Sequence, residues 1–344
     1  MSEDFTWRDA GRTVVFRRGG AARAVEVLRE HGVEEFELLS TERALGEVDG
    51  DLSEAAHGVH LVAQGQVPAA AAPLLDALAH PHDAGKGARA RPLVALGGGR
   101  VVDVAKAVGA VSGAEVVAIP TTLSGAPMTA IHRLPEGAEE RAQGMVRPRL
   151  VIADPEAMTC QEERELRASA MNALAHGADT LYLPTSNPVS EMTALRGAEL
   201  VGSALDEERA ERDRGALALG AILCGYAIDS AGLGLHHVIC QTLVRICGTP
   251  HAETNAAILP QAVGFLAERA SEAYEGLAAS LGTGLPGLPE RIEGLGRPQR
   301  LSALGGDESR LDEALEGMLQ RPELQRVPGP PSHADLAKLV QAAW

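Results

Sequence analysis

Four side chains in the second half of the sequence have the types and spacing of a shared polar site. Asn172 and His176 are four residues apart in a helical stretch, which puts both on one helix face. His237 lies in another helical stretch, and His251 follows fourteen residues later, directly after Thr249-Pro250. Side chains from facing helices commonly build one site inside a bundle. Three imidazoles suffice to bind a divalent metal ion, although a single histidine is more often only a hydrogen-bonded core or surface residue.

A glycine-rich turn in the first half has the features of a phosphate-binding segment. Residues 92–107 read PLVALGGGRVVDVAKA, an apolar strand that continues through three glycines into a helix. Glycine lets a phosphate approach the backbone, and the amides and dipole at a helix start favour its negative charge. A second turn, PTTLSG at 120–125, follows the next apolar strand and adds hydroxyl groups. The segment is neither a GxGxxG fingerprint nor a Walker A loop, and a plain tight turn is the alternative.

The first half must position this turn, and its pattern alternates short apolar runs with helical stretches. Such alternation predicts a parallel sheet with helices on both faces. Helices are expected at 20–31 and 68–79, and residues 80–91 have the composition of a polar loop. The expected strands are 12–16, 35–40, 58–63, 92–96, 115–120 and 150–153.

The second half must position the four polar side chains, and from Cys160 onward its pattern is helical. Ser332 and Asp335 have the spacing of a capping box that starts a last short helix. The charge run 206–214 is expected to be a solvated helix end, and the Gly/Pro-rich stretch 282–298 a loop. We therefore expect an α/β domain at 1–158 and an all-α domain at 159–344. The expected helices are 161–183, 188–205, 216–247 and 255–279.

Composition excludes several classes of protein. The net charge of -16 argues against a nucleic-acid partner, because a phosphate backbone requires a basic face. No run approaches the roughly 18 apolar residues that span a bilayer, so no membrane partner is expected. The first residues form no signal segment, and the four cysteines have no CxxC spacing, as expected for free thiols in a cytoplasmic protein.

These motifs, taken in order, resemble the iron-containing alcohol dehydrogenase superfamily, most closely its maleylacetate reductase branch. The resemblance covers nearly the whole chain and implies a dehydroquinate synthase-like fold, with a dinucleotide-binding α/β domain before an all-α domain. It also makes a homodimer the default. The matching stretches are GGGRVVDVAKA (97–107), AIPTTLSGAPMT (118–129), LVIADP (150–155), MNALAHGADTLY (171–182), GLGLHHVICQTL (232–243) and GTPHAETNAAILP (248–260).

The resemblance also implies roles for individual residues. Those expected to hold NAD(H) or NADP(H) are Gly97, Gly98, Gly99, Asp103, Thr121 and Thr122, with Lys106 in the helix beneath the phosphates. In metal-dependent members an Asp and three His bind iron or zinc, and these positions fall here on Asn172, His176, His237 and His251. The Asp-to-Asn change is shared with maleylacetate reductases, which do not require a metal. An uncharged donor set lowers cation affinity, so sites with and without metal both stay open.

Three departures from the family concern the substrate. The family usually has a histidine four residues after His237, where this chain has Gln241, which cannot titrate and so cannot act as a general acid. Maleylacetate reductases usually carry a basic Lys-Arg-Thr-Gly stretch, where residues 136–147 are acidic here. A dicarboxylate requires fixed cations, so maleylacetate itself is in doubt. The usual Ser-Glu of the second turn is Ala126-Pro127.

Two further departures concern the dinucleotide. Arg100 stands where the glycine motif normally has Ser, and could either pair with a phosphate or face water. The strand at 35–40 ends in Ser40-Thr41, where an acid would grip the ribose 2′-hydroxyl and repel a 2′-phosphate. Thr41 is therefore expected beside the cofactor, and NADPH stays open beside NADH.

The leading hypothesis is hydride transfer between NAD(P)H and a small oxygenated, carboxylate-bearing substrate. The cofactor does the redox chemistry, and the histidines polarise a carbonyl or donate a proton, directly or through a metal. The expected catalytic residues are His176, His237, His251, Asn172 and Gln241. One rival is a non-redox lyase or synthase on the same fold, which the change at Gln241 would suit. Another is a cofactor-binding partner protein that has lost catalysis.

Overall fold

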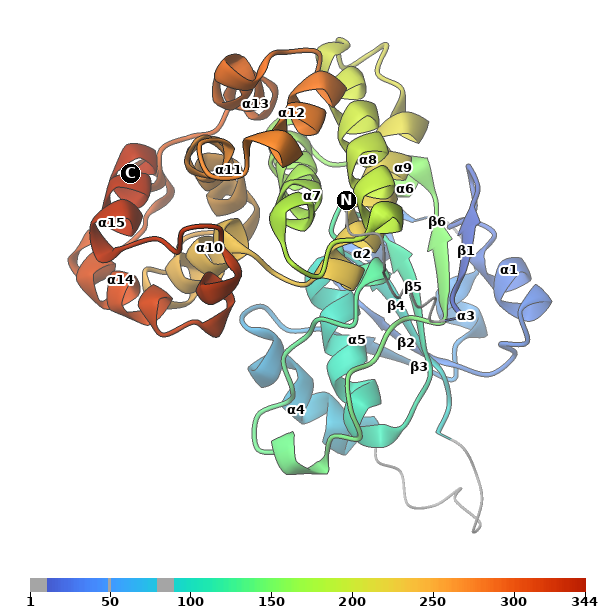
Figure 1. Ribbon diagram of the computed structural model, residues 1–344. Helices are drawn as coiled ribbons and strands as arrows, with labels where there is room; N and C mark the ends of the chain where they lie inside the picture. Colours follow the sequence, from blue (N-terminus) through green and yellow to red (C-terminus); the bar gives the residue numbers. More distant parts are fainter. Residues whose placement is uncertain (1–10, 49–50, 79–89) are drawn as a thin grey trace. The chain divides into compact units, whose positions relative to one another are not determined.

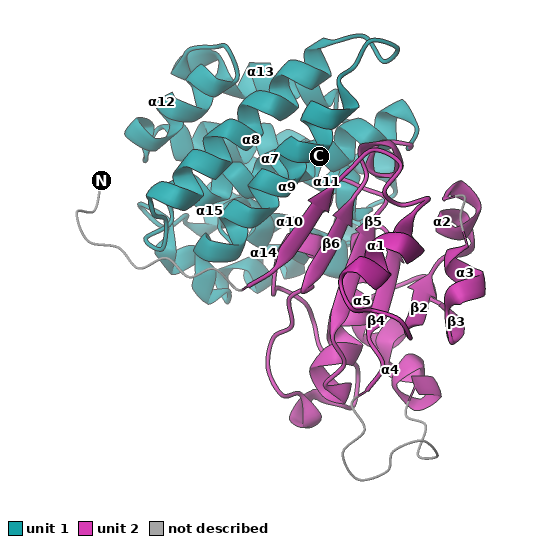
Figure 2. Cartoon of the chain, turned by 90° about the vertical axis from the view of Figure 1, so that its right-hand side faces the viewer, with its two compact units in different colours: residues 1–8, 161–344 teal, residues 9–160 magenta. Residues whose placement is uncertain are grey.

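The computed structural model describes residues 11–48, 51–78 and 90–344, in which the secondary structure follows two different plans (Figure 1). The chain divides into two compact units that meet in the sequence at Cys160 and Gln161 (Figure 2). The unit before this boundary is a sheet with helices, and the unit after it is entirely helical.

Six parallel strands form the sheet, in the order β1-β6-β5-β4-β2-β3 (Figure 1). All six strands expected from the sequence are present, with small shifts at their ends. The inner strands are buried, whereas the edge strands β1 and β3 are partly exposed. The strands are β1 (Thr13–Phe16), β2 (Glu37–Ser40), β3 (Gly58–Leu61), β4 (Leu93–Gly97), β5 (Val116–Pro120) and β6 (Leu150–Ala153).

Helices cover both faces of this sheet, because successive strand residues point to opposite sides. Leu39 and Ala95 belong to the apolar cluster of α4 and α5, whereas Leu38 and Val94 belong to the cluster of α1. The sheet is therefore doubly wound, as the alternating pattern predicts. The loop expected at 80–91 lies mostly outside the described residues. The helices of this unit are α1 (Ala24–Glu30), α2 (Glu42–Glu47), α3 (Leu52–Ala55), α4 (Val67–Leu78), α5 (Gly99–Ser112) and α6 (Pro155–Met158).

The second unit is built around α7, which is buried along almost its whole length and packs against α8, α9 and α11. This arrangement confirms the all-α prediction for the second half. Its last helix begins with the expected capping box of Ser332 and Asp335. The helices are α7 (Glu163–Tyr182), α8 (Pro188–Asp206), α9 (Arg214–Ala231), α10 (Leu235–Ile246), α11 (His251–Ala267), α12 (Ser271–Ser280), α13 (Leu288–Gly296), α14 (Leu311–Leu319) and α15 (His333–Ala343).

Three predictions about helix boundaries are wrong. The stretch 216–247 is not one helix, because the break at 232–234 separates α9 from α10 at an angle of 97°. The stretch 255–279 is likewise two helices, α11 and α12. The Gly/Pro-rich stretch 282–298 contains α13, whose Leu288, Ile292 and Leu295 are buried. Glycines mark the break at 232–234, whereas residues 268–270 contain neither glycine nor proline and Pro260 lies inside α11, so packing decides how far each helix extends.

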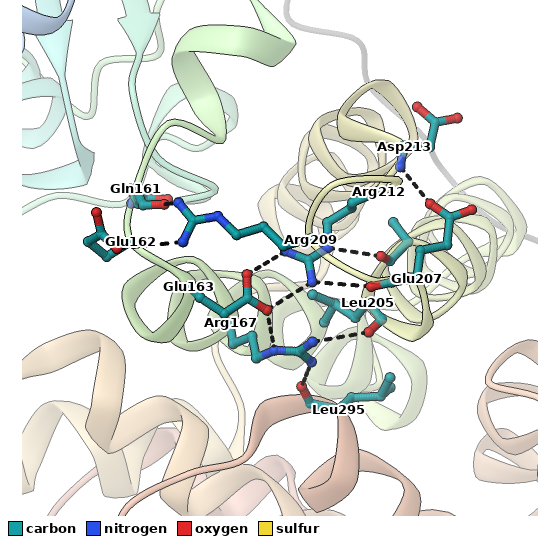
Figure 3. A network of polar contacts seen from close by, with 11 residues as sticks. Gln161, Glu162, Glu163, Arg167, Leu205, Glu207, Arg209, Arg212, Asp213 and Leu295 are labelled. Atoms are coloured by element: carbon teal, nitrogen blue, oxygen red, sulfur yellow. Dashed lines mark hydrogen bonds and ion pairs between the residues drawn. The ribbon is translucent and has the colours of Figure 1, made fainter.

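The charge run 206–214 is also not simply a solvated helix end, since Arg212 is buried. Its guanidinium donates to both carboxylate oxygens of Glu163 at the start of α7, at 2.8 and 2.9 Å (Figure 3). Arg167 donates to the same carboxylate at 2.6 Å and to the carbonyl oxygens of Leu205 and Leu295. This network ties the start of α7 to the ends of α8 and α13.

The apolar content of the helices does not produce a simple membrane-spanning segment. In the described part of the chain, no single helix is long and apolar enough to cross a bilayer, although the bent pair α9 and α10 together reaches that length and composition. The four cysteines are free thiols, as expected, with Cys160 exposed and the other three buried.

Candidate active site

The glycine turn joins β4 to α5 at the carboxyl edge of the sheet. Gly97 ends the strand with a φ of +154°, in the region that disfavours side chains, and Gly98 is the N-cap of α5. A Cβ atom added at Gly99 would lie 2.3 Å from the hydroxyl oxygen of Ser124, so only glycine fits there without a shift. The first amides of a helix have no partner within it, which makes this turn suited to a phosphate.

The hydroxyl-bearing turn after β5 lies beside the glycine turn. The amide of Thr121 donates to the carbonyl oxygen of Gly97 at 3.0 Å, and a Cβ at Gly98 would approach the Thr122 side chain to 3.0 Å. Thr41 follows the neighbouring strand β2, and its hydroxyl caps the start of α2. The structure thus brings the predicted glycines and threonines to one edge of the sheet.

Lys106 and Asp103 lie one turn apart on α5, where Lys106 is completely buried. Its ammonium group is 2.7 Å from the Asp103 carboxylate and donates to the carbonyl oxygens of Ala126, Thr129 and Ile131 at 3.0, 3.0 and 2.8 Å. These bonds fasten the segment after the second turn to α5. Lys106 therefore positions that segment, and direct contact of Lys106 or Asp103 with a dinucleotide stays a prediction.

The histidine cluster belongs to the helical unit and joins α7 to the start of α10. Asn172, His176 and His237 are all buried. The rings of His176 and His237 are stacked, with their centroids 4.8 Å apart and an angle of 18° between their planes. The histidine of the i,i+4 pair on α7 therefore meets the histidine of α10.

The two other predicted catalytic residues lie at the margin of this cluster. His251 is the first residue of α11 and is exposed, although its charge contributes to the low pKa of His176. Gln241 follows His237 by one turn of α10, and its side-chain oxygen accepts a hydrogen bond from Arg321 at 3.2 Å. His176 and His237 thus form the centre of the cluster, and His251 lies near enough for its charge to act on His176.

Asp179 is a further candidate site residue, absent from those expected above. Its carboxylate is 2.6 Å from Nδ1 of His237 and accepts hydrogen bonds from the amide of Gly234 and the hydroxyl of Tyr182, both at 3.1 Å. Burial raises its pKa, but the hydrogen bond and charge of His237 outweigh that effect, so the pKa is lowered overall. A signal exists in the sequence, because Asp179 is three residues after His176, on the same face of α7.

The Asp179 carboxylate determines which nitrogen of His237 is available. Because Nδ1 faces the carboxylate as a donor, the neutral ring keeps its lone pair on Nε2. That Nε2 atom and Nδ1 of His176 are buried and have no hydrogen-bond partner within residues 11–48, 51–78 and 90–344. Burial, followed by the charges of the neighbouring histidines, holds the pKa of His176 well below 6.5, so this ring is neutral at pH 7.

These two nitrogen atoms fit a cation or a polar substrate atom, because a buried imidazole without a partner is costly unless a bound group satisfies it. Asp179, His236 and His237 also offer ligand atoms within 4.8 Å of one another. However, the Asp179 oxygens already accept several hydrogen bonds, and Nε2 of His236 lies 3.0 Å from the carbonyl oxygen of Asn255. Asp179 is therefore placed to orient His237, whereas His236 is held through Nε2 and has a buried Nδ1 atom without a hydrogen-bond partner in the described part of the chain.

Comparisons with known proteins show the family to which the chain belongs. Residues 15–157 match the family model described as "Iron-containing alcohol dehydrogenase", and residues 167–344 match "Fe-containing alcohol dehydrogenase family, C-terminal". The chain is 35% identical to a maleylacetate reductase of Burkholderia cepacia over 67% of each chain. It is 30% identical to the maleylacetate reductase of Rhizobium sp. over 99% of this chain and 98% of the relative.

Solved structures give the same result for the fold. The structure of maleylacetate reductase from Rhizobium sp. superposes with a TM-score of 0.84 at 29% identity, covering 99% of this chain and 98% of that one. The maleylacetate reductase structure from Agrobacterium tumefaciens gives a TM-score of 0.82 at 28% identity, with the same coverage. The chain therefore belongs to the iron-containing alcohol dehydrogenase family and is an NAD(P)-dependent oxidoreductase.

Proposed function

We propose that this enzyme uses a reduced nicotinamide dinucleotide to reduce a small keto or enol acid. The observation that carries the proposal is the His237 ring, which Asp179 holds with an unpartnered Nε2 atom beside His176 in the described part of the chain. The maleylacetate reductases among its relatives support a carboxylate-bearing substrate. We keep the substrate class wider than maleylacetate, because residues 136–147 are acidic in place of a basic stretch.

The unit that contains the sheet binds the dinucleotide in this proposal. The amides of the glycine turn and the dipole of α5 attract the pyrophosphate, and the hydroxyl groups of Thr121 and Thr122 add hydrogen bonds. Thr41, after the end of β2, lies where the adenosine ribose of a dinucleotide is bound in doubly wound folds. The nicotinamide supplies the hydride, and the protein supplies orientation and charge.

The histidine cluster acts on the substrate oxygen. Reduction of a carbonyl adds a hydride to carbon and a proton to oxygen, so the oxygen needs donors or positive charge as the reaction proceeds. Nδ1 of His176 can donate to that oxygen when it carries the ring proton, whereas the lone pair on Nε2 of His237 would act through a bound cation or after the ring gains a proton, which Asp179 would stabilise. Gln241 cannot supply the proton, but its side-chain oxygen accepts from Arg321, which leaves the amide nitrogen as a hydrogen-bond donor.

We propose that this cluster binds a divalent cation, Fe²⁺ or Zn²⁺. His176, His237 and His251 would hold it, with Asn172 as a neutral fourth donor, and it would supply Lewis acidity at the substrate oxygen. The low pKa of His176 keeps that ring in the neutral form that a metal requires. Metal analysis of the protein purified without chelator tests this: one equivalent of iron or zinc is expected, and a metal-free, fully active enzyme would contradict it.

The proposal also covers the cellular location and the oligomeric state. We expect a cytoplasmic homodimer, and the exposed Val14 and Phe16 on the edge strand β1 offer an apolar surface for a second copy. Sedimentation of the purified protein distinguishes a dimer from a monomer.

The reaction itself is tested by a substrate screen. Purified protein is mixed with NADH or NADPH and a panel of small keto and enol acids that includes maleylacetate, and the absorbance of the reduced nicotinamide is followed. Loss of absorbance with at least one acid is expected. Binding of the dinucleotide without oxidation across the panel would favour the lyase or the silent partner protein, which none of the comparisons supports.

A further inference from the structure

Arg100 is the second residue of α5 and follows the glycine turn directly. Its Nη1 atom donates to the side-chain oxygen of Gln64 at 2.6 Å. Its Nε atom is buried and has no hydrogen-bond partner in the described part of the chain. The side chain therefore neither faces water freely nor has all its donors satisfied.

The Arg100–Gln64 contact passes over the end of another strand. Gln64 follows β3 and Arg100 follows β4, and in the sheet β2 lies between these two strands. Neighbouring strands are about 4.8 Å apart, so a bond between residues after β3 and β4 must cross the carboxyl end of β2. The residues at that end are Ser40 and Thr41.

In doubly wound dinucleotide-binding folds, the strand beside the one that leads into the glycine turn ends near the ribose 2′ position of the adenosine. Here β2 is a neighbour of β4 in the sheet. An acid at this strand end binds the 2′-hydroxyl of NAD, whereas a nearby arginine accommodates the 2′-phosphate of NADP. Here the Ser40 hydroxyl donates to the carbonyl oxygen of Leu96 at 2.8 Å, and the Thr41 hydroxyl caps α2. Neither residue is charged, so neither repels a 2′-phosphate at this strand end.

The bond to Gln64 also does not use the side of the guanidinium that carries Nε and Nη2. Nε and Nη2 form a fork of parallel N–H donors that matches two oxygens of a phosphate. Gln64 engages Nη1, which lies outside that fork. A glutamine that fixes one nitrogen restricts the long side chain without neutralising its charge.

We propose that Arg100 binds the 2′-phosphate of NADP(H), that Gln64 positions it, and that this enzyme therefore prefers NADPH to NADH. The inference rests on the proposed function, because it takes the glycine turn as a nicotinamide dinucleotide site. Arg100 is a specificity residue in this proposal: it contacts the phosphate that distinguishes the two cofactors, far along the dinucleotide from the nicotinamide ring.

Equilibrium binding tests the proposal without any turnover. NADPH, NADH, adenosine 2′,5′-bisphosphate and 5′-AMP are titrated into the wild-type protein and the variants Arg100→Ser, Gln64→Ala and Arg29→Ala. The wild type is expected to bind the bisphosphate at least about tenfold more tightly than 5′-AMP, since a hydrogen bond to a charged group is worth roughly this much. Arg100→Ser should weaken NADPH binding by about 10- to 100-fold and leave NADH binding nearly unchanged.

The two other variants are controls for position and for charge. Gln64→Ala keeps the arginine and should lose only part of the NADPH preference. Arg29→Ala removes one positive charge from the exposed side of α1, near the helix end remote from the glycine turn, and should bind all four ligands as the wild type does. Circular dichroism of each variant confirms that it is folded.

Three results would overturn the proposal. An equal loss of NADH and NADPH affinity in Arg100→Ser would mean that Arg100 binds the shared pyrophosphate. Equal affinity of the wild type for NADH and NADPH would leave Arg100 without a role in selection. A wild-type protein that binds neither dinucleotide would contradict the proposed function itself, which separates that failure from the other two.

Discussion

The glycine turn and the histidine cluster use opposite means to make a site. At the turn, the binding groups are backbone amides, and the contribution of the side chains is mainly their absence at Gly97, Gly98 and Gly99. In the cluster, the groups are imidazole nitrogens, and the buried carboxylate of Asp179 orients the ring of His237. The turn should therefore be sensitive to added atoms, and the cluster to a changed hydrogen-bond partner.

Among variants that change a hydrogen-bond partner in the histidine cluster, Asp179→Asn is expected to have the largest effect. This substitution keeps the size of the side chain. An amide can offer its N–H to Nδ1 of His237, which would move the ring proton to Nε2 and remove the free lone pair. Loss of such an orienting partner typically costs about 10- to 100-fold in activity or metal affinity. We expect that loss in kcat/KM, measured with the best substrate of the screen.

A milder variant checks that this effect follows the hydrogen bonds. Tyr182→Phe removes one donor to Asp179 and one acceptor for the amide of Leu235, while the carboxylate stays. It should reduce kcat/KM less than Asp179→Asn does. If Asp179→Asn kept wild-type kcat/KM, the orienting role of Asp179 would be wrong. Dinucleotide affinity, measured in both variants, should stay at the wild-type value.

The next effect is expected from Gly99→Ala, which adds one carbon at the turn. The new Cβ would lie 2.3 Å from the Ser124 hydroxyl oxygen and 2.9 Å from the Ser124 Cβ, so the two turns must separate. Overpacking of this kind costs about 1–3 kcal/mol, and we expect NAD(P)H affinity to fall by about tenfold.

A second substitution tests the cause of that loss. In Gly99→Ala with Ser124→Gly the clashing side chain is absent, so part of the dinucleotide affinity should return. No recovery in the double variant, with Ser124→Gly alone binding normally, would show that the contact of Gly99 with Ser124 is not what the turn requires.

The smallest effect on either site is expected from Glu163→Gln, in the network of Figure 3. The hydrogen bond from Arg212, followed by that from Arg167, holds the pKa of Glu163 at about 2, although burial opposes the shift. A lowered pKa stabilises the fold above pH 4.5, and this contribution is lost as the pH falls from 4.5 toward 2. At pH 7 the variant should lose about 1–3 kcal/mol of unfolding free energy, with unchanged dinucleotide affinity.

The pH dependence separates this network from general damage to α7. Thermal unfolding should show a large difference between the wild type and Glu163→Gln at pH 7 and a smaller one near pH 3. Glu162→Gln is the matched control, because Glu162 is exposed and pairs with Arg209 only at 3.5 Å. A difference for Glu163→Gln that does not shrink with falling pH would rule out the carboxylate as its cause.

Much of the first unit could be predicted from the sequence, because its signals are local. Buried parallel strands are short apolar runs, and the glycines after Leu96 mark the turn in the same stretch. The helical unit is harder to predict. The break at 232–234 and the helix α13 depend on which apolar faces find partners in the folded unit, and that information lies far along the chain.

The candidate site likewise combines local sequence signals with contacts between residues far apart in the sequence. Asn172, His176 and His237 could be identified by residue type and by the family resemblance, but the role of Asp179 depends on the start of α10 meeting α7. Its partners on α10 and just before it are more than fifty residues away in the sequence. The exposure of His251 also arises only from packing.

The most direct test of the histidine cluster is the comparison of chemistry with binding in His237→Ala. The substitution removes Nε2 and should lower kcat by about 10²- to 10⁴-fold, while the affinity for the reduced dinucleotide stays unchanged, because the glycine turn is intact. His333→Ala, which changes an exposed histidine of α15, serves as the control and should keep wild-type kcat. Wild-type turnover in His237→Ala would contradict the assignment of the histidine cluster as the place where the substrate reacts.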